Sequence, residues 1–432
     1  MSETRNIAIH VPVLARVEGE GALHLDVRGG RIEALSLRIF EPPRYFEKFL
    51  EGRDTAELPD LVARICGICP VAYQMSAVHA IEALSGIDPG PWVRAMRRVL
   101  YCGEWIESHA LHIHLLAAPD FLGYDNAIAM AAAHSEALRR GLRLQALGND
   151  IIRLLGARSV HPVGVRVGGF HHAPAPDAVA ALRARLEASM PEAEALVAWT
   201  AQLALPESDQ DFVSVALRHD AEYPMNAGRL VSDRGLDIDA AEFDRHFEER
   251  QVPHSTALHC RLHGEPYLVG PLARLNLNAD RLPAATRRLL DAAGLRLPSR
   301  NLYHSIVARA LELHAALVEA VALLADYRAP GRPCTDAPVR AGIAYGCTEA
   351  PRGILWHRYE LDAGGLIRAA RIVPPTSQNQ ARIETDLRAD LEAFGLDRPD
   401  DALRRRCETV IRNYDPCISC ATHFLDLRVT RS

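Results

Sequence analysis

The sequence lacks any apolar run long enough to cross a membrane. Every run falls short of the roughly 18 residues that a membrane-spanning helix needs, and residues 1–6 are polar with no signal-peptide core. Lysine is nearly missing, with Lys48 as the only one, and 49 Lys plus Arg against 55 Asp plus Glu give a formal charge of −6. This charge has the wrong sign for a phosphate-binding surface, so we expect no nucleic-acid partner. We expect a cytoplasmic protein with no transmembrane segment.

Cysteine is also scarce. Nine cysteines in 432 residues are an odd number at low density, which argues against a disulfide framework and suits a reducing compartment. Four of them form two CxxC pairs, Cys66 with Cys69 and Cys417 with Cys420. The others are isolated, which is typical of small buried hydrophobic residues: Cys102, Cys260, Cys334, Cys347 and Cys407.

Two CxxC pairs can together supply four thiolates to a soft or borderline metal. A structural zinc site and two independent redox pairs are the alternatives. Zinc ribbons place their pairs roughly 15–20 residues apart, whereas nearly the whole chain separates Cys69 from Cys417, and no thioredoxin-like βαβ pattern surrounds either pair. If the pairs meet, the entire fold must bring them together, as in a buried catalytic site.

The residues after Cys69 predict a helix over 70–84. Pro70 suits the first helical position and Gly86 suits the stop. The cysteines would then lie near the positive end of the helix, with Arg64 beside them. Both features favour the thiolate over the thiol.

The remaining pattern predicts an α+β fold, mainly α, with a core of long helices and peripheral β-hairpins. No linker marks a boundary, so we expect one domain over residues 1–432. Residues 208–278 show weaker periodicity and predict irregular structure with short strands. Alternating apolar residues predict hairpins from runs 23–27 with 35–39 and 359–361 with 366–373. Helical spacing predicts helices over 92–106, 127–155, 177–205 and 302–327.

Longer motifs resemble the large catalytic subunits of nickel-iron hydrogenases. The resemblance depends mainly on RICGIC (64–69) and DPCISCATH (415–423). The stretches ICGICPVAYQ and DPCISCATH are most similar to the cytoplasmic, bidirectional NAD(P)-linked branch, the sulfhydrogenase alpha subunits. Supporting motifs follow over almost the full length: ARVEGEG (15–21), RYFE (44–47), EGRD (51–54), HALHIHLLAAPDF (109–121), HPVGVRVGGF (161–170), EAPRG (349–353) and VPPTSQNQ (373–380).

The resemblance implies a nickel-iron centre held by the four paired cysteines. Cys66 and Cys417 would be terminal nickel ligands, whereas Cys69 and Cys420 would bridge nickel to iron. The iron would also carry carbon monoxide and cyanide, which need partners in a dry pocket. The family's positions for binding them are Arg352 and the turn formed by Pro375, Thr376 and Ser377.

The implied reaction is the reversible oxidation of dihydrogen to protons and electrons. Splitting this weak acid requires a metal to accept the hydride and a base to accept the proton. Cys417 would be that base and Glu18 the first relay carboxylate, although sequence context alone would place Glu18 in solvent. Arg352 and Asp120 would be further catalytic groups, Asp120 close to the open metal face.

A magnesium ion near the centre is implied as well. Its ligands would be Glu47, the backbone carbonyl of Val373 and His423. Residues 424–432 follow His423, where mature family members commonly end after proteolysis, so we expect a cleavable extension. A second departure is Tyr73, because many relatives carry histidine there; tyrosine can donate a hydrogen bond to a thiolate but cannot accept a proton at neutral pH.

The electrons must leave through partner subunits. The five isolated cysteines lack the CxxCxxC grouping of an iron-sulfur chain, and GxGxxG is absent. We therefore expect an iron-sulfur small subunit, a diaphorase subunit that binds FAD and NAD(P), and a further iron-sulfur subunit. A maturation protease and nickel-insertion factors are expected to act on the chain.

Two other functions are compatible with the resemblance. A regulatory hydrogen sensor would share the metal site but turn over slowly. A non-catalytic subunit, like the quinone-site subunit of respiratory NADH dehydrogenases, would share the fold, with a four-cysteine metal site at most. The presence of all four cysteines favours the enzyme over the second alternative.

Overall fold

The structure is a computed structural model and describes residues 6–422. His423 and residues 424–432, for which a magnesium ligand and a cleavable extension are predicted, lie outside the described residues. Helices and strands mix throughout the chain, which confirms the predicted α+β class with a helical core.

The helices are distributed over the whole described chain. The longer ones are α3 (Pro70–Ser85), α4 (Pro91–Leu111), α7 (Ser135–Gly156), α8 (Pro176–Ala188), α9 (Met190–Ala201), α11 (Pro271–Asn278), α12 (Ala284–Ala292), α13 (Ser305–Ala325), α14 (Pro375–Phe394) and α15 (Asp400–Tyr414). The shorter ones are α1 (Phe46–Leu50), α2 (Leu58–Val62), η1 (His112–Ala117), α5 (Ala118–Leu122), α6 (Ala127–Ala131), η2 (Ala240–Glu242), α10 (Phe243–His246), η3 (Ala279–Arg281), η4 (Leu302–His304) and α16 (Ile418–Ala421).

The strands form several small sheets. They are β1 (Ile7–Val11), β2 (Gly21–Arg28), β3 (Arg31–Ile39), β4 (Val165–Arg166), β5 (Gly169–Phe170), β6 (Val213–Arg218), β7 (Arg229–Ser232), β8 (Asp237–Ile238), β9 (Phe247–Arg250), β10 (His259–Leu262), β11 (Tyr267–Leu268), β12 (Gly342–Ala350), β13 (Gly353–Leu361) and β14 (Ile367–Val373).

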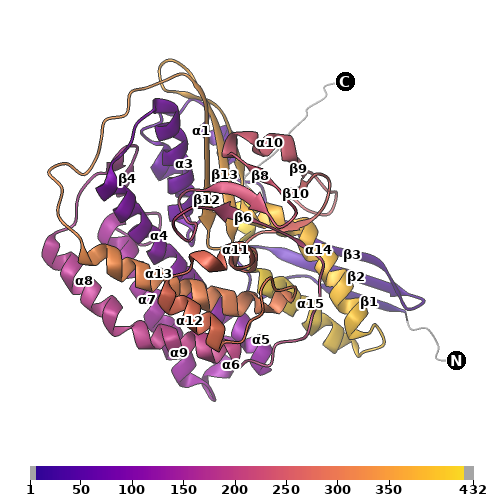
Figure 1. The fold of residues 1–432 in the computed structure, drawn as a ribbon. Coiled ribbons are helices and arrows are strands. Elements are labelled where there is room, and N and C mark those ends of the chain that lie inside the picture. Colours follow the sequence, from indigo (N-terminus) through magenta and orange to yellow (C-terminus); the bar gives the residue numbers. More distant parts are fainter. Residues whose placement is uncertain (1–5, 423–432) are drawn as a thin grey trace, which may run out of the picture.

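A bundle of long helices forms the core of the molecule (Figure 1). Helix α4 packs against α7 and α13, and α8 and α9 also pack against α13. The predicted helices over 92–106 and 302–327 are confirmed by α4 and by η4 with α13. Helix α3 confirms the prediction for 70–84, and its C-cap Gly86 has a φ of 68°, a left-handed conformation that glycine adopts without strain.

Two of the predicted helices are wrong as single elements. The range 127–155 is divided between α6 and α7, and the range 177–205 between α8 and α9. In the second case Pro191 lies in the first turn of α9. Since proline has no backbone N–H to donate, α8 cannot continue through it, and the chain starts a new helix there.

Both predicted hairpins exist, each within a three-stranded antiparallel sheet. Strands β2 and β3 pair as predicted, and β1 adds to the edge of β2. Strands β13 and β14 pair as predicted, and β12 adds to β13. The range 208–278 contains the expected short strands, arranged as the sheet β11-β6-β7-β8 and the hairpin β9-β10, together with the helix α11.

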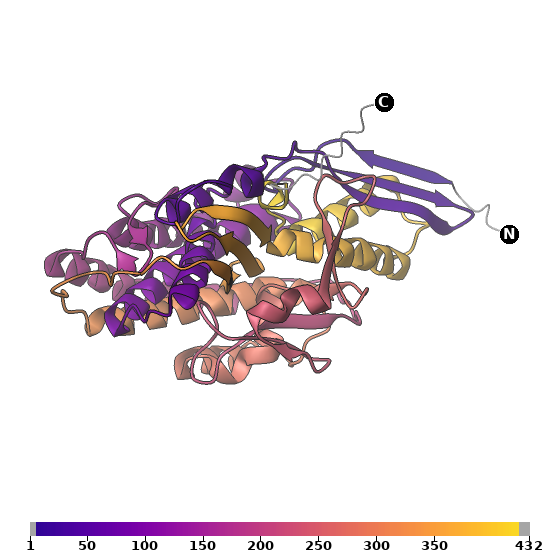
Figure 2. The same ribbon diagram turned by 90° about the horizontal axis from the view of Figure 1, so that it is seen from above.

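The first three strands and the last helices of the described chain pack together at one side of the helical bundle. The sheet β1-β2-β3 extends from one end of the molecule, beside α14 and α15 (Figure 2). Apolar residues of β1–β3, α14, α15 and α16 share one hydrophobic cluster. Within residues 6–422, no helix is both long and apolar enough to span a bilayer.

Candidate metal centre

Four cysteine side chains meet inside the molecule. The Sγ atoms of Cys66 and Cys69 are 2.9 Å apart, as are those of Cys417 and Cys420. Across the two pairs, Cys66 lies 3.5 Å from Cys417 and Cys69 lies 3.5 Å from Cys420. Each of these residues is at most 3% exposed. The fold therefore brings both ends of the chain to one buried set of four sulfur atoms.

The first pair lies at the start of helix α3. Cys69 is the N-cap of α3 and Pro70 is its first residue. The backbone N–H groups of Val71 and Ala72 lie in the first turn of the helix. They donate to the carboxylate of Glu104 on α4, at 2.6 and 3.1 Å. The N–H groups of Ile68 and Cys69 donate to the Cys66 sulfur, at 3.3 and 3.2 Å. The backbone thus already directs hydrogen-bond donors at one of the sulfurs.

The second pair is held by the segment between β1 and β2. The N–H of Ile418 donates to the backbone carbonyl of Glu18 at 2.9 Å, and the N–H of Ser419 donates to the Glu18 carboxylate at 3.0 Å. The Ser419 hydroxyl donates to the other carboxylate oxygen. Glu18 is half-buried beside the Cys417 segment, not in solvent as its sequence context suggested.

Arg44 connects the two cysteine segments. Its guanidinium donates to the backbone carbonyl of Ile65, at 2.6 Å, and to that of Ser419. The backbone N–H of Arg44 donates to the backbone carbonyl of Thr422 at 2.7 Å. Sequence reasoning assigned Arg44 no role, although it opens the RYFE motif. It fixes the separation of the pairs.

The four thiols influence one another's ionisation. Burial opposes ionisation of Cys66, but hydrogen bonds with Cys417, Cys420 and Cys69 and the charge of Arg352 lower its pKa well below the usual range. Hydrogen bonds with Cys420, Cys66 and Cys69, and burial in addition, raise the pKa of Cys417 well above it. Four thiolates repel each other at this spacing, so all four can ionise together only around cations.

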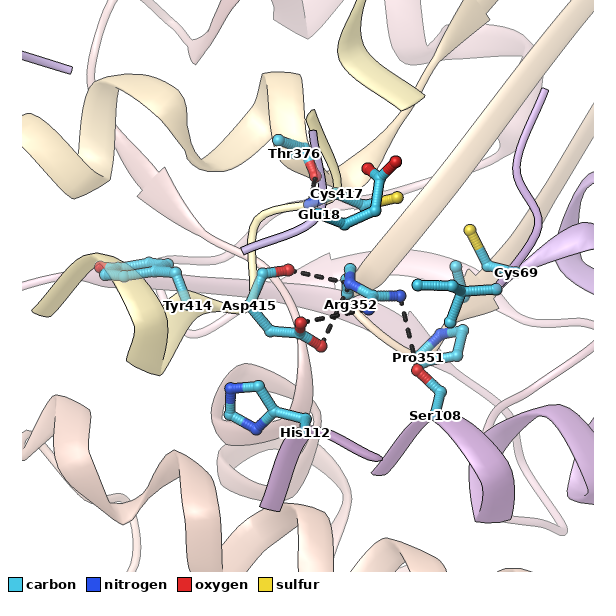
Figure 3. A network of polar contacts seen from close by, with 12 residues as sticks. Glu18, Cys69, Ser108, His112, Pro351, Arg352, Thr376, Tyr414, Asp415 and Cys417 are labelled. Atoms are coloured by element: carbon cyan, nitrogen blue, oxygen red, sulfur yellow. Dashed lines mark hydrogen bonds and ion pairs between the residues drawn. The ribbon is translucent and has the colours of Figure 1, made fainter. Parts of the chain in front are cut away.

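The cation near the cysteines is Arg352, not Arg64. Arg64 is exposed, whereas Arg352 is 2% exposed. Its Nε donates to the backbone carbonyl of Asp415 at 2.8 Å and its Nη2 donates to the Asp415 carboxylate at 3.1 Å (Figure 3). Burial opposes its charge, but the negative charge of Asp415 raises the pKa of Arg352 well above its usual value. Arg352 therefore stays charged.

The turn predicted at Pro375 to Ser377 is instead the first turn of helix α14. Pro374 is the N-cap and Pro375 the first residue of that helix, where a missing N–H costs nothing. Thr376 and Ser377 are both buried there, and the Thr376 hydroxyl accepts a hydrogen bond from the N–H of Cys417 at 3.0 Å. The start of α14 thus supports the second cysteine pair directly.

Asp120 lies between two arginines. Its carboxylate accepts from Arg412 Nε and Nη2, at 2.7 and 2.9 Å, and forms an ion pair with Arg16. Arg412 belongs to α15 and Arg16 to the segment that also carries Glu18. Asp120, on α5, thus connects the segment of Glu18 to helix α15, which precedes the second cysteine pair.

Two of the three predicted magnesium ligands are neighbours. Glu47, on α1, accepts the N–H of Ile372 at 2.7 Å, and Val373 is the next residue along β14. The Val373 carbonyl accepts from the side chain of Gln378 at 3.2 Å. A carboxylate oxygen and a backbone carbonyl oxygen therefore lie close to the start of α14.

Tyr73 faces the cysteines from the first turns of α3. Burial raises the pKa of its hydroxyl well above the usual value, and the cysteine charges, Cys420 first, raise it further. Tyr73 therefore remains protonated and can donate a hydrogen bond to a thiolate. Its ring packs at 5.6 Å from that of His357.

Two further residues of the site were missed from the sequence. Asp415, which holds Arg352, stands two residues before Cys417 in the predicted motif, so its position was a usable signal. Burial works against its charge, but Arg352, His112 and Arg309 lower its pKa. Ser108, 3.4 Å from Arg352 Nη1, belongs to the buried face of α4 and had no such signal.

The donor set identifies the class of site. Four buried thiols within 4.8 Å of one another are soft ligands that suit nickel and iron and are unsuited to magnesium or calcium. The fold and this centre together define a buried metalloenzyme core with cysteine ligands from opposite ends of one chain.

Comparison with known proteins gives the family. Residues 44–141 and 246–423 match the nickel-dependent hydrogenase family. The chain is 32% identical to the alpha chain of sulfhydrogenase 2 of Pyrococcus furiosus, covering 97% of this chain and 100% of that one. It is also 27% identical to the beta chain of the NAD-reducing hydrogenase HoxS of Cupriavidus necator, over 95% and 94% of the two chains.

A solved structure agrees with these relatives. The crystal structure of an NAD+-reducing NiFe hydrogenase in the H2-reduced state superimposes with a TM-score of 0.88 at 29% identity, over 97% of this chain and 100% of that chain. This chain belongs to the nickel-dependent hydrogenase family. It is an enzyme with the fold of a nickel-iron hydrogenase large subunit, which confirms the resemblance found in the sequence.

Proposed function

We propose that this chain is the catalytic subunit of an enzyme that interconverts dihydrogen with protons and electrons. The observation that carries the proposal is the set of four buried cysteine sulfurs from both ends of the chain. Bound there, nickel and iron would supply a soft Lewis-acid pair at which dihydrogen is split. Cys66 and Cys417 would be terminal ligands, and Cys69 and Cys420 would bridge.

The surrounding residues suit carbon monoxide and cyanide on the iron. Arg352 is a buried permanent cation with a fixed guanidinium plane, and Thr376 and Ser377 present hydroxyls from the start of α14. Such groups could donate hydrogen bonds to small diatomic ligands in this buried site. Asp415 keeps Arg352 in place.

The proton would leave through the second cysteine pair. The Cys417 sulfur would accept it, and the Glu18 carboxylate, hydrogen-bonded to Ser419 of the same segment, would take it next. Asp120, which forms ion pairs with Arg16 and Arg412, would be a further catalytic group close to the open metal face.

Glu47, the Val373 carbonyl and His423 would bind magnesium, an ion that takes oxygen and water ligands. Tyr73 would donate a hydrogen bond to a cysteine thiolate in place of the usual histidine.

We also propose the partner subunits that would receive the electrons. Electrons would pass to an iron-sulfur small subunit, and from there to NAD(P) by way of a flavin-bearing diaphorase and a further iron-sulfur subunit, in the cytoplasm. Similarity to an NAD+-reducing enzyme supports this acceptor. We also propose that residues 1–432 are one domain, that nickel-insertion factors load it, and that a protease removes residues 424–432.

Substitution of one ligand tests the proposal. We expect Cys417→Ser to abolish both nickel binding and dihydrogen oxidation in the purified complex, because the hard hydroxyl is a poor nickel ligand. Cys260→Ser is the matched control: Cys260 is a buried thiol outside the cluster that accepts a hydrogen bond from Tyr267 at 3.3 Å, which serine can also accept. Full nickel occupancy with normal turnover in Cys417→Ser would refute the assigned role.

A further inference from the structure

A second group of metal-ligating side chains lies apart from the cysteine centre. His254, His259 and Glu384 each offer one ligand atom, and these atoms lie within 4.8 Å of one another. His254 is in the loop after β9, His259 begins β10, and Glu384 is on α14. Three separate parts of the chain thus converge on one point.

The hydrogen bonds leave ligand capacity at this cluster. One Glu384 oxygen, Oε1, lies 2.8 Å from His254 Nε2 and accepts the N–H of Leu37 at 3.0 Å. His259 is only 2% exposed, and its Nε2 is buried without a hydrogen-bond partner among the described residues. Leaving a buried polar atom unpaired destabilises the folded chain. A bound cation coordinated by His259 would remove such a cost.

The cluster also has access to solvent. His254 lines a surface cavity of about 870 Å³ together with Arg38 and Thr256. Three protein ligands beside an open cavity are the arrangement of a metal site that keeps a coordination position for water. Two imidazoles and a carboxylate suit zinc, whereas magnesium and calcium prefer ligand sets made of oxygen alone.

We propose that His254, His259 and Glu384 bind a zinc-class divalent ion, with solvent as the fourth ligand. The ion fastens the β9-β10 hairpin to the middle of α14, and Glu384 also holds the N–H of Leu37 on β3. Helix α14 begins at the metal centre, where Thr376 contacts Cys417. The bound ion therefore stabilises helix α14, which supports the cysteine cluster, without taking part in the reaction there.

Zinc uptake by the purified complex tests this proposal. Protein treated with a chelator, given Zn²⁺ alone and then gel-filtered should retain one additional zinc per chain and unfold at a higher temperature. The zinc X-ray absorption spectrum should show nitrogen and oxygen neighbours at about 2.0–2.1 Å and lack the sulfur distance of about 2.3 Å. A sulfur shell, or no uptake, would overturn the proposal.

Variants of the two partly exposed ligands locate the site without disturbing the core. His254→Ala and Glu384→Gln should each weaken zinc binding at least tenfold and abolish the thermal shift, with nickel content unchanged. His172→Ala, a substitution of an exposed histidine elsewhere, should bind zinc like the wild type. Equal zinc uptake in the wild type and both ligand variants would contradict the assignment.

Discussion

At the scale of single residues, the centre depends on side chains that hold the cysteine segments. Glu18 holds the segment of the second pair through its backbone carbonyl and its carboxylate, and Arg44 joins that segment to the first pair. These contacts place the carboxylate of Glu18 and the guanidinium of Arg44 next to the cysteine segments. Any role of Glu18 in proton transfer thus rests on a position that the backbone already fixes.

The first prediction concerns that carboxylate. We expect Glu18→Gln to retain the metals, because glutamine can still accept the Ser419 N–H, but to slow isotope exchange between deuterium gas and water by about 100-fold or more, since an amide cannot relay a proton. Glu20→Gln, at an exposed position on the same segment, should leave exchange unchanged. Wild-type exchange rates in Glu18→Gln would remove Glu18 from the proton route.

A second residue-scale prediction concerns His114 in η1. Its Nδ1 donates to the carbonyl of Ala110 at 2.9 Å, and its ring stacks on Trp199 at 5.6 Å. Burial, together with the charge of Arg140, lowers the pKa of His114 from 6.5 to about 3. Between about pH 6.5 and pH 3 the unfolded chain therefore binds a proton that the folded chain does not. The free energy of unfolding is consequently unaffected by His114 above about pH 6.5 and falls as the pH drops toward 3.

The predicted signature is a difference in pH slope. His114→Phe keeps the stacking but cannot titrate, so its unfolding temperature should fall less steeply than that of the wild type between about pH 6.5 and 4.5, where one histidine contributes up to about 1.4 kcal/mol per pH unit. Thermal unfolding across this range measures it. Parallel curves for the two proteins would show that His114 does not titrate as described.

At the scale of elements, helices α4 and α7 cross at two glycines. A Cβ atom on Gly148 would lie 2.5 Å from the backbone nitrogen of Glu107 and 2.6 Å from the carbonyl oxygen of Gly103. Only glycine permits this approach, because the opposing atoms are backbone and cannot move aside. The crossing positions the face of α4 that carries Glu104 and Ser108, which contact the site.

Substitution at the crossing should therefore destabilise the protein. We expect Gly148→Ala to reduce stability by about 1–3 kcal/mol, the usual range for overpacking, visible as a lower unfolding temperature. Gly331→Ala provides the comparison, since no atom lies within 4 Å of a Cβ built there. If both variants unfold at the wild-type temperature, the crossing is looser than described.

Elements with a clear apolar period could be predicted, and others could not. Alternation revealed β2, β3, β13 and β14, and the three-and-four spacing revealed α4 and α13. Helix α14 gave little apolar signal because its buried face includes polar residues: Gln378 donates to the carbonyl of Ile354 at 2.6 Å, and Asn379 accepts the N–H of Val269 at 3.0 Å. Tertiary hydrogen bonds of this kind leave no periodicity in the sequence.

Strand β12 escaped prediction for a related reason. Most of its second half is buried on both faces, so the alternation that marks a half-exposed strand is lost. Helix α15 is different, because its buried residues Leu403, Cys407, Val410 and Ile411 do follow helical spacing. That signal was present in the sequence and could have been used.

At the scale of the whole molecule, the site is a product of chain topology. One hydrophobic cluster contains all four cysteines together with apolar residues of α3, α4, α7 and α13. A second cluster packs β1–β3 against α14 and α15, and so brings the N-terminal segment of Glu18 beside Cys417. Cysteine spacing could predict that the pairs meet, but the second cluster, Arg44 and the Asp415–Arg352 contact emerge only from the folded chain.

The central claim is that opposite ends of the chain form one thiolate cage for nickel and iron. Elemental analysis combined with infrared spectroscopy of the purified complex tests it most directly. We predict one nickel per chain, together with infrared bands of carbon monoxide and cyanide bound to iron. Zinc in place of nickel, with both kinds of band missing, would contradict the account.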